Sequence, residues 1–273
     1  MELTVVMYSV RDEIATVTLN RPARMNAWVG RMNTEYRFAL EQAELDDKVR
    51  AVIVTGAGRA FCVGADSRAL EGHVAKGAYN PGTPADIAKP GYGVRPEFDA
   101  DLAYHFGLTK PVIAAINGAV AGIGLVLACF ADLRFAAAGA KFTTAHGKLN
   151  LPAELGLSWL LPRMIGLTRA NELLLTSRVF LAEEALHLGL VNGVFPSDEL
   201  LPNVTQFARD MVSNISPGSL RETKRQIYTD LHRDVASAVD ASRGHIERMV
   251  KEPDFAEGVA AFMEKRPPRW SKK

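Results

Sequence analysis

The sequence predicts an α/β core followed by a helical C-terminal region. Strand and helix patterns alternate as far as about Pro196, and this alternation is typical of α/β folds. From Glu199 onward, apolar side chains recur only with helical spacing. Within the core, two buried strands run directly into glycine-rich turns. These observations predict a core at residues 1–198 and a helical region at residues 199–273.

The N-terminal part of the core predicts a hairpin, a helix and a strand. Residues 3–9 and 14–19 alternate apolar and polar side chains on either side of a polar turn, which predicts a β-hairpin. Residues 32–45 carry apolar side chains at helical spacing and predict a helix. The short apolar run at residues 51–55 predicts a buried strand.

The next part of the chain predicts two short helices and a loop. Residues 68–75 and 98–108 have helical patterns. Between them, residues 76–96 are rich in glycine, proline and polar side chains, a composition typical of loops. We therefore expect a long loop between two helices.

Residues 110–132 are the most informative segment of the chain. They predict a buried strand at residues 111–116, a tight turn at Asn117-Gly118, and a helix that opens at Gly122 and Gly124. A helix that begins at such a turn directs unpaired backbone N–H groups at whatever lies in front of it. A strand-turn-helix whose glycines only permit close packing stays open as an alternative.

A membrane span is a weaker reading of the same segment. The run from Pro111 to Ala131 carries no charge and is long enough to cross a bilayer. Asn117 and four glycines or prolines interrupt the run, and nothing else in the sequence resembles a membrane protein. We expect no membrane span.

A second segment, residues 51–67, also runs from a strand into glycines. If the two segments converge, two backbone N–H groups can bind one carbonyl oxygen and form an oxyanion hole. This arrangement would polarise a thioester carbonyl. The sequence GAGRAF is a poor nucleotide-binding motif, because it lacks G-x-G-x-x-G and the Lys-Ser/Thr ending of a phosphate loop.

The remaining elements follow the same alternation and then become helical. Strands are predicted at residues 133–137 and 141–143, and a helix at residues 158–165. Helices of the C-terminal region are predicted at residues 199–213, 218–231, 233–250 and 254–264.

Composition narrows the classes of function. The chain has 273 residues, 48% of them hydrophobic, and a formal net charge of +1, which gives no general electrostatic case for nucleic-acid binding. Cys62 and Cys129 lie in apolar segments and are expected to be buried thiols in a reducing compartment. The first residues show no basic segment followed by an apolar run, as a signal peptide would. We expect a cytoplasmic protein.

Six blocks in order resemble the crotonase, or enoyl-CoA hydratase/isomerase, superfamily. They are TVTLNRPARMNAW (16–28), GAGRAFCVGAD (56–66), KPVIAAINGAVAGIGLVLACFADLRFA (110–136), AELGLSWLLPRMIG (153–166), FLAEEALHLGLVNGVFP (180–196) and EGVAAFMEKRPPRW (257–270). The resemblance implies a crotonase-like spiral of repeated ββα units with a helical C-terminal trimerisation region, commonly paired into hexamers. It also implies an acyl-CoA thioester substrate and no metal or redox cofactor, since coenzyme A is part of the substrate.

The resemblance also implies site residues. The two oxyanion donors would be the backbone N–H groups of Ala65 and Ile123, where isoleucine replaces a commoner glycine. Asp66 would support the turn that presents Ala65. Substrate contacts are implied at Ala23, Arg24, Met25, Ala65, Asp66, Ser67, Arg68, Gly122 and Ile123.

The chain departs from the hydratases of this family at two positions. Hydratases hold one water between two glutamates, and here those positions are Val126 and His146. Glu154 instead occupies the position where some double-bond isomerases of the superfamily carry a lone glutamate. It is the sole acidic residue between Asp132 and Glu172. We therefore expect Glu154 to carry the proton.

Alternatives remain open for both residues and for the reaction. Glu154 also fits a charge at a helix N-terminus, and His146 fits either a hydrogen-bonded loop residue or an acid/base partner of Glu154. The expected function is isomerisation or hydration of an enoyl-CoA through a thioester enolate. The alternatives are an acyl-CoA hydrolase of the same superfamily and a catalytically degenerate acyl-CoA-binding protein. Val126, which cannot transfer a proton, favours the degenerate binding protein, whereas the acid Glu154 favours an enzyme.

Overall fold

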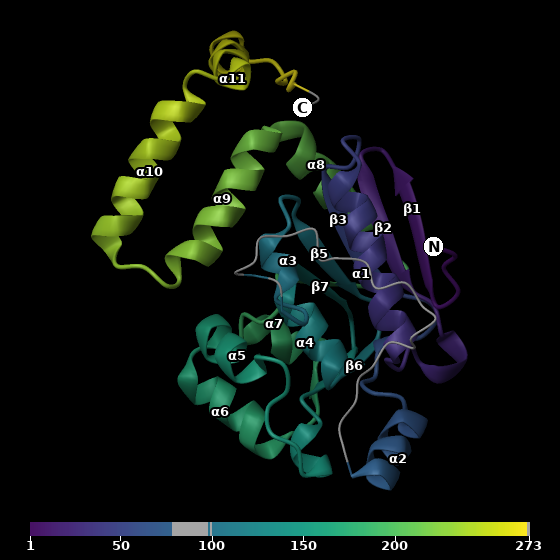
Figure 1. Cartoon of the computed structure of the whole chain (residues 1–273). Coiled ribbons are helices and arrows are strands. Elements are labelled where there is room, and N and C mark those ends of the chain that lie inside the picture. Colours follow the sequence, from purple (N-terminus) through teal and green to yellow (C-terminus); the bar gives the residue numbers. More distant parts are fainter. Residues whose placement is uncertain (78–97, 99, 272–273) are drawn as a thin grey trace.

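The computed structural model describes residues 1–77, 98 and 100–271 (Figure 1). Within these residues, six strands form one sheet in the order β1-β2-β3-β5-β7-β10. Strands β1 and β2 pair antiparallel, and the other neighbours pair parallel. The strands are β1 (Val6–Arg11), β2 (Ile14–Leu19), β3 (Ala51–Gly56), β5 (Val112–Ile116), β7 (Leu133–Ala137) and β10 (Gly193–Phe195).

A smaller sheet, of four strands in the described part of the chain, has the order β4-β6-β8-β9. Its strands are β4 (Ala60–Cys62), β6 (Ala119–Ala121), β8 (Lys141–Thr143) and β9 (Phe180–Leu181). Strands β4, β6 and β8 are parallel to one another. Each follows a strand of the large sheet, so β3-β4, β5-β6 and β7-β8 are successive turns of a spiral. The expected fold class of repeated ββα units is confirmed.

Helices complete these turns and cover the sheets. They are α1 (Gly30–Leu45), α2 (Ser67–Lys76), α3 (Tyr104–Gly107), α4 (Ile123–Phe130), α5 (Leu157–Ile165), α6 (Leu167–Thr176) and α7 (Ala182–His187), with short 3-10 helices at Pro22–Arg24 and His146–Leu149. The C-terminal helices are α8 (Leu200–Asn214), α9 (Pro217–Asp230), α10 (Val235–Met249) and α11 (Pro253–Glu264).

The central strands of the large sheet, β3 and β5, are buried on both faces. All six residues of β3 are buried, as expected for a central parallel strand. Val52 and Val54 join the main core, whereas Ile53 joins a second cluster on the opposite face. Helix α8 covers that second face through Leu200 and Val204, among others. A helix beyond residue 198 therefore packs on the sheet, and the predicted division at 198/199 stays a prediction.

Helix α9 is fastened to the core by a polar cluster around Asp132. The Asp132 carboxylate accepts hydrogen bonds from Val112 N–H at 2.6 Å, Lys224 Nζ at 2.8 Å and Tyr228 OH at 2.7 Å. Beside it, the rings of Phe106 and Tyr228 stack with centroids 3.8 Å apart. These contacts join β5, the α4–β7 turn, α3 and α9.

Helices α10 and α11 extend away from the sheets (Figure 1). None of the residues of α10 is buried, and in α11 only Ala261 is buried. Apolar side chains such as Phe262 and Met263 are largely exposed. This exposure agrees with the expected assembly into trimers, which stays a prediction.

Most of the predicted elements are confirmed within one to three residues at each end. The helix predicted at residues 98–108 is wrong in length: α3 has four residues, and Leu102 just before it has a left-handed φ of 63°. The sequence also gave no separate prediction for the three-residue strands β4 and β6. The loop predicted at residues 76–96 lies almost entirely outside the described residues.

The uncharged run from Pro111 to Ala131 forms a strand, a turn, a second strand and a short helix. Among the helices that the described residues form, none is both long and apolar enough to cross a membrane.

Candidate active site

The three parallel strands of the small sheet end at one edge. Ala121 of β6 pairs with Thr143 of β8, and the Gly122 N–H donates to the Thr143 carbonyl at 3.3 Å. Because parallel strands have their carboxyl ends at the same edge, the segments that follow β4, β6 and β8 gather there. These segments carry Ala65, Ile123 and His146, which are three of the predicted site residues.

The two glycine turns meet at this edge. Gly64 and Gly122 have φ values of 99° and 49°, which residues other than glycine rarely adopt. A Cβ on Gly122 would lie 3.6 Å from Gly64 Cα, and one on Gly64 would lie 3.4 Å from the Ala121 carbonyl oxygen. The structure thus brings the two predicted donor segments into backbone contact.

The backbone around Ala65 leaves its N–H group available. Trp28 N–H donates to the Gly64 carbonyl at 2.7 Å, and Asp66 N–H donates to the Trp28 carbonyl at 3.0 Å. In this parallel bridge the residues flanking Ala65 make the bonds, so the Ala65 N–H points to the other side. Ile123 is the first residue of α4, and the N–H groups of the first residues of a helix have no acceptor within that helix.

Asp66 stabilises the turn that presents Ala65. Its side chain caps α2 by accepting from Arg68 N–H at 3.0 Å, and it pairs with Arg21 at 2.9 Å and Arg24 at 3.3 Å. Burial by itself would raise the pKa of Asp66, but these hydrogen bonds and charges outweigh burial and hold that pKa below its ordinary value. Asp66 is therefore an ionised, structural carboxylate.

Arg24 also joins the two predicted substrate-contact segments. Its Nη2 lies 3.1 Å from the Ser67 hydroxyl oxygen. Ala23, Arg24, Ser67 and Arg68 are exposed, whereas Met25 is half-buried. Arg24 and Ser67 thus lie side by side at the surface, next to the turn that contains Gly64. The sequence motif contained Arg21, but its pairing with Asp66 was not predicted.

Glu154 lies against the glycine turn. Its Oε2 is 3.4 Å from the position that a Cβ on Gly122 would take. Burial raises the pKa of Glu154, and the charge interaction with His146 offsets part of that rise. The carboxyl group stands immediately beside the residue that precedes Ile123, so it can reach a group bound there.

His146 is buried next to this acid. It is 6% exposed, and its Nδ1 atom has no hydrogen-bond partner among the described residues. The sequence left open that His146 is a hydrogen-bonded loop residue. Among the described residues, its Nδ1 atom makes no such bond. His146 follows β8, whose Thr143 carbonyl accepts from the Gly122 N–H, and Glu154 lies against the same Gly122.

Backbone strain accompanies both residues. Ala145 immediately precedes His146 and has φ 60°, and Leu155 immediately follows Glu154 and has φ 45°. Each such residue costs about 1–3 kcal/mol and persists only where the surroundings enforce it, a pattern common at functional sites.

Val126 contributes no proton-transfer group. It is fully buried in α4, one turn after Gly122, and its N–H donates to the Gly122 carbonyl at 3.1 Å. With Val126 here and an imidazole at position 146, the pair of carboxylates that would hold a water is missing from these two positions.

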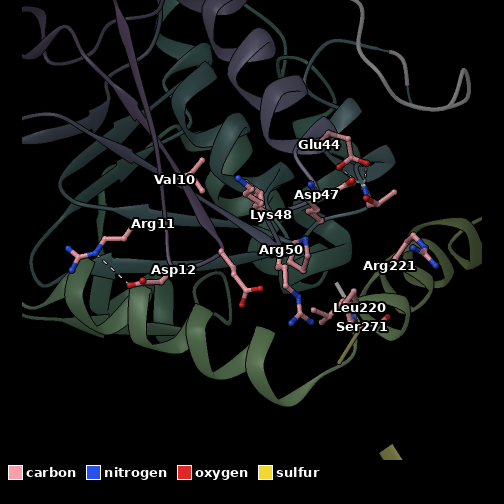
Figure 2. A pocket seen from close by; sticks show the side chains of 16 residues that line it. Val10, Arg11, Asp12, Glu44, Asp47, Lys48, Arg50, Leu220, Arg221 and Ser271 are labelled. Carbon is pink, nitrogen blue, oxygen red and sulfur yellow. Dashed lines mark hydrogen bonds and ion pairs between the residues drawn. The ribbon is translucent and has the colours of Figure 1, made fainter. Parts of the chain in front are cut away.

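A separate cavity of about 620 Å³ lies between the β1–β2 turn, the end of α1 and the start of α9 (Figure 2). Both acidic and basic side chains line it, including Asp47, Lys48, Arg50 and Arg221. None of its lining residues is a predicted site residue. The candidate site is therefore defined by the converging turns and not by this cavity.

Comparisons with known proteins agree with the geometry. The family model described as "Enoyl-CoA hydratase/isomerase" matches residues 9–273. A protein of Mycobacterium tuberculosis H37Rv named as a probable enoyl-CoA hydratase is 39% identical over 265 residues, covering 94% of this chain and 89% of that protein. The 1,2-epoxyphenylacetyl-CoA isomerase of Escherichia coli K12 is 34% identical over 270 residues, covering 98% of each.

Solved structures are similar as well. The crystal structure of a probable enoyl-CoA hydratase/isomerase from Mycobacterium abscessus matches with a TM-score of 0.86 and 31% sequence identity. The match covers 99% of this chain and 100% of that one.

Proposed function

Because the chain belongs to the enoyl-CoA hydratase/isomerase family, we propose that it binds an acyl-CoA thioester and moves a double bond along the acyl chain. The observation that carries this proposal is the position of Glu154 against Gly122, where the turns that contain Gly64 and Gly122 are in contact. No metal or redox cofactor is part of the proposal.

The first step is polarisation of the thioester. The N–H groups of Ala65 and Ile123 donate to the thioester oxygen, which gains negative charge as the enolate forms. Backbone donors of this kind are each worth roughly 3 kcal/mol of transition-state stabilisation. Their rigidity here comes from the bridge to Trp28 on one side and helix α4 on the other.

The second step is transfer of the proton by Glu154. In its ionised form the carboxylate removes a proton from the acyl chain, and the resulting acid returns it to another carbon. The raised pKa brings the group closer to neutral pH, where a shuttle that must both accept and give a proton works best.

Isomerisation is favoured over hydration because of Val126. Hydration needs a water held and activated at the site, and valine offers no hydrogen bond for that purpose. Hydration by Glu154 without a second carboxylate remains the competing reaction, since one relative is named as a probable hydratase and another as an isomerase.

The test is incubation of a 3-enoyl-CoA and, separately, of the conjugated 2-enoyl-CoA in D₂O, followed by mass spectrometry. Isomerisation leaves the product mass unchanged apart from deuterium, whereas hydration adds one water. Glu154→Gln should reduce turnover by about 10² or more and leave CoA-ester binding nearly unchanged. Glu247→Gln, at an exposed position in α10, is the matched control and should have full activity.

Two results would contradict the proposal. Full activity of Glu154→Gln would remove Glu154 as the proton carrier. Saturable binding of CoA esters without turnover of any enoyl-CoA would instead favour a degenerate binding protein.

A further inference from the structure

His146 lies close to the candidate active site. It follows β8 at the edge where the Ala65 and Ile123 segments also end. The Thr143 carbonyl at the end of β8 accepts from the Gly122 N–H, and Glu154 lies against that same glycine. An acyl group held by those two donors would lie at the same edge of the small sheet as His146.

The imidazole is incompletely hydrogen-bonded. The Nδ1 atom is shielded from solvent and has no partner among the residues that the structure describes. A buried polar atom without a partner is unfavourable, and such atoms in folded proteins call for a specific explanation. Ala145, immediately before His146, has a φ of 60°, a strained conformation of the kind that clusters at functional sites.

A hydrocarbon acyl chain would leave this atom unsatisfied. An acyl chain that carries a hydroxyl, oxo or epoxide oxygen could hydrogen-bond to it, because imidazole nitrogen either donates or accepts according to tautomer. Sites that hydrogen-bond one substrate group discriminate strongly against analogues that lack the group, since the buried partner is then unpaired.

We propose that His146 is a specificity-determining residue that hydrogen-bonds an oxygen on the acyl chain, so that the preferred substrates are acyl-CoA thioesters with an oxygen function beyond the thioester. This inference rests on the proposed function, because it places the acyl chain at Glu154.

The experiment compares the binding of three saturated CoA esters by calorimetry: hexanoyl-CoA, 3-hydroxyhexanoyl-CoA and 4-oxohexanoyl-CoA. Mass spectrometry of each sample after titration verifies that the ligand is intact. The wild-type protein should bind at least one oxygen-bearing ester about tenfold more tightly than hexanoyl-CoA.

Three variants test whether the preference for an oxygen-bearing ester depends on a hydrogen bond from His146. His146→Leu should abolish this preference by weakening only the oxygen-bearing ester. His146→Asn keeps a hydrogen-bonding atom near the Nδ1 position and should retain part of the preference. His187→Leu, at an exposed position at the end of α7, is the matched control and should leave the preference intact.

A thermal melt without ligand gives a second readout. Leucine removes an unpaired buried nitrogen and leaves no partner behind, so His146→Leu should melt no lower than the wild type. A purely structural histidine would show the reverse, with a lower melting temperature and an unchanged preference.

The outcomes distinguish the two proposals. Equal affinity of the wild type for all three esters would overturn the inference about His146 and leave the proposed function standing. Equal loss of affinity for all esters in His146→Leu would also overturn it. Failure of the wild type to bind any of the esters would instead refute the proposed function.

Discussion

The polar cluster around Asp132 gives the sharpest stability prediction. Lys224 is deeply buried, with a side chain 5% exposed, and its ammonium group pairs with Asp132 at 2.8 Å. Asp132→Ala removes that counter-charge together with the acceptors for Val112 N–H and Tyr228 OH. Breaking a buried pair by deleting one partner typically costs about 3–5 kcal/mol, because the remaining charge stays desolvated.

The same cluster supplies an internal control. Lys224→Met removes the buried charge but leaves Asp132 bonded to Val112 N–H and Tyr228 OH, so it should cost less than Asp132→Ala. In the double variant the unpaired ammonium is gone, and its loss of stability should be smaller than the sum of the two single losses.

The assay is urea unfolding of all four proteins at pH 7, with the free energy of unfolding compared at equal protein concentration. A loss below about 1 kcal/mol in Asp132→Ala, the range of an exposed pair, would refute the reasoning. Additive losses in the cycle would show that Asp132 and Lys224 do not interact across the α9 junction.

The remaining predictions concern the site and the assembly. Because burial raises the pKa of Glu154, the folded protein holds that proton more tightly than the unfolded chain, so wild type should lose stability relative to Glu154→Gln as pH rises from the ordinary carboxyl range through the raised pKa. Urea unfolding of both proteins at several pH values tests this. The same pH dependence of the free energy of unfolding in both proteins would contradict it. Gly122→Ala, at φ 49° and facing Glu154, should cost about 1–2 kcal/mol and lower turnover, whereas Gly244→Ala in α10, with open space around it, should be neutral or stabilising. Sedimentation should show a trimer or hexamer, because α10 and α11 expose apolar side chains; a stable monomer at micromolar concentration would argue against this.

Several elements were predictable because their pattern is local. The strand at 133–137 and the four C-terminal helices follow from the spacing of their apolar side chains. The length of α3 was not predictable, because the left-handed conformation of Leu102 interrupts a pattern that otherwise reads as helical. Strands as short as β4 and β6 carry too few residues to show alternation, so the second sheet emerges only from pairing.

The sequence by itself determined the chemical groups available at the site. Val126, His146 and the lone Glu154 can be read directly from the sequence. The resemblance to the family implies that the first two stand where hydratases carry glutamates. Tertiary structure alone decided how these groups meet. The contact between Gly64 and Gly122, the approach of Glu154 to that turn and the unpaired His146 Nδ1 all depend on the register of three short parallel strands. These strands are far apart in the sequence, and three residues each are too few for a local pattern to specify how they pair.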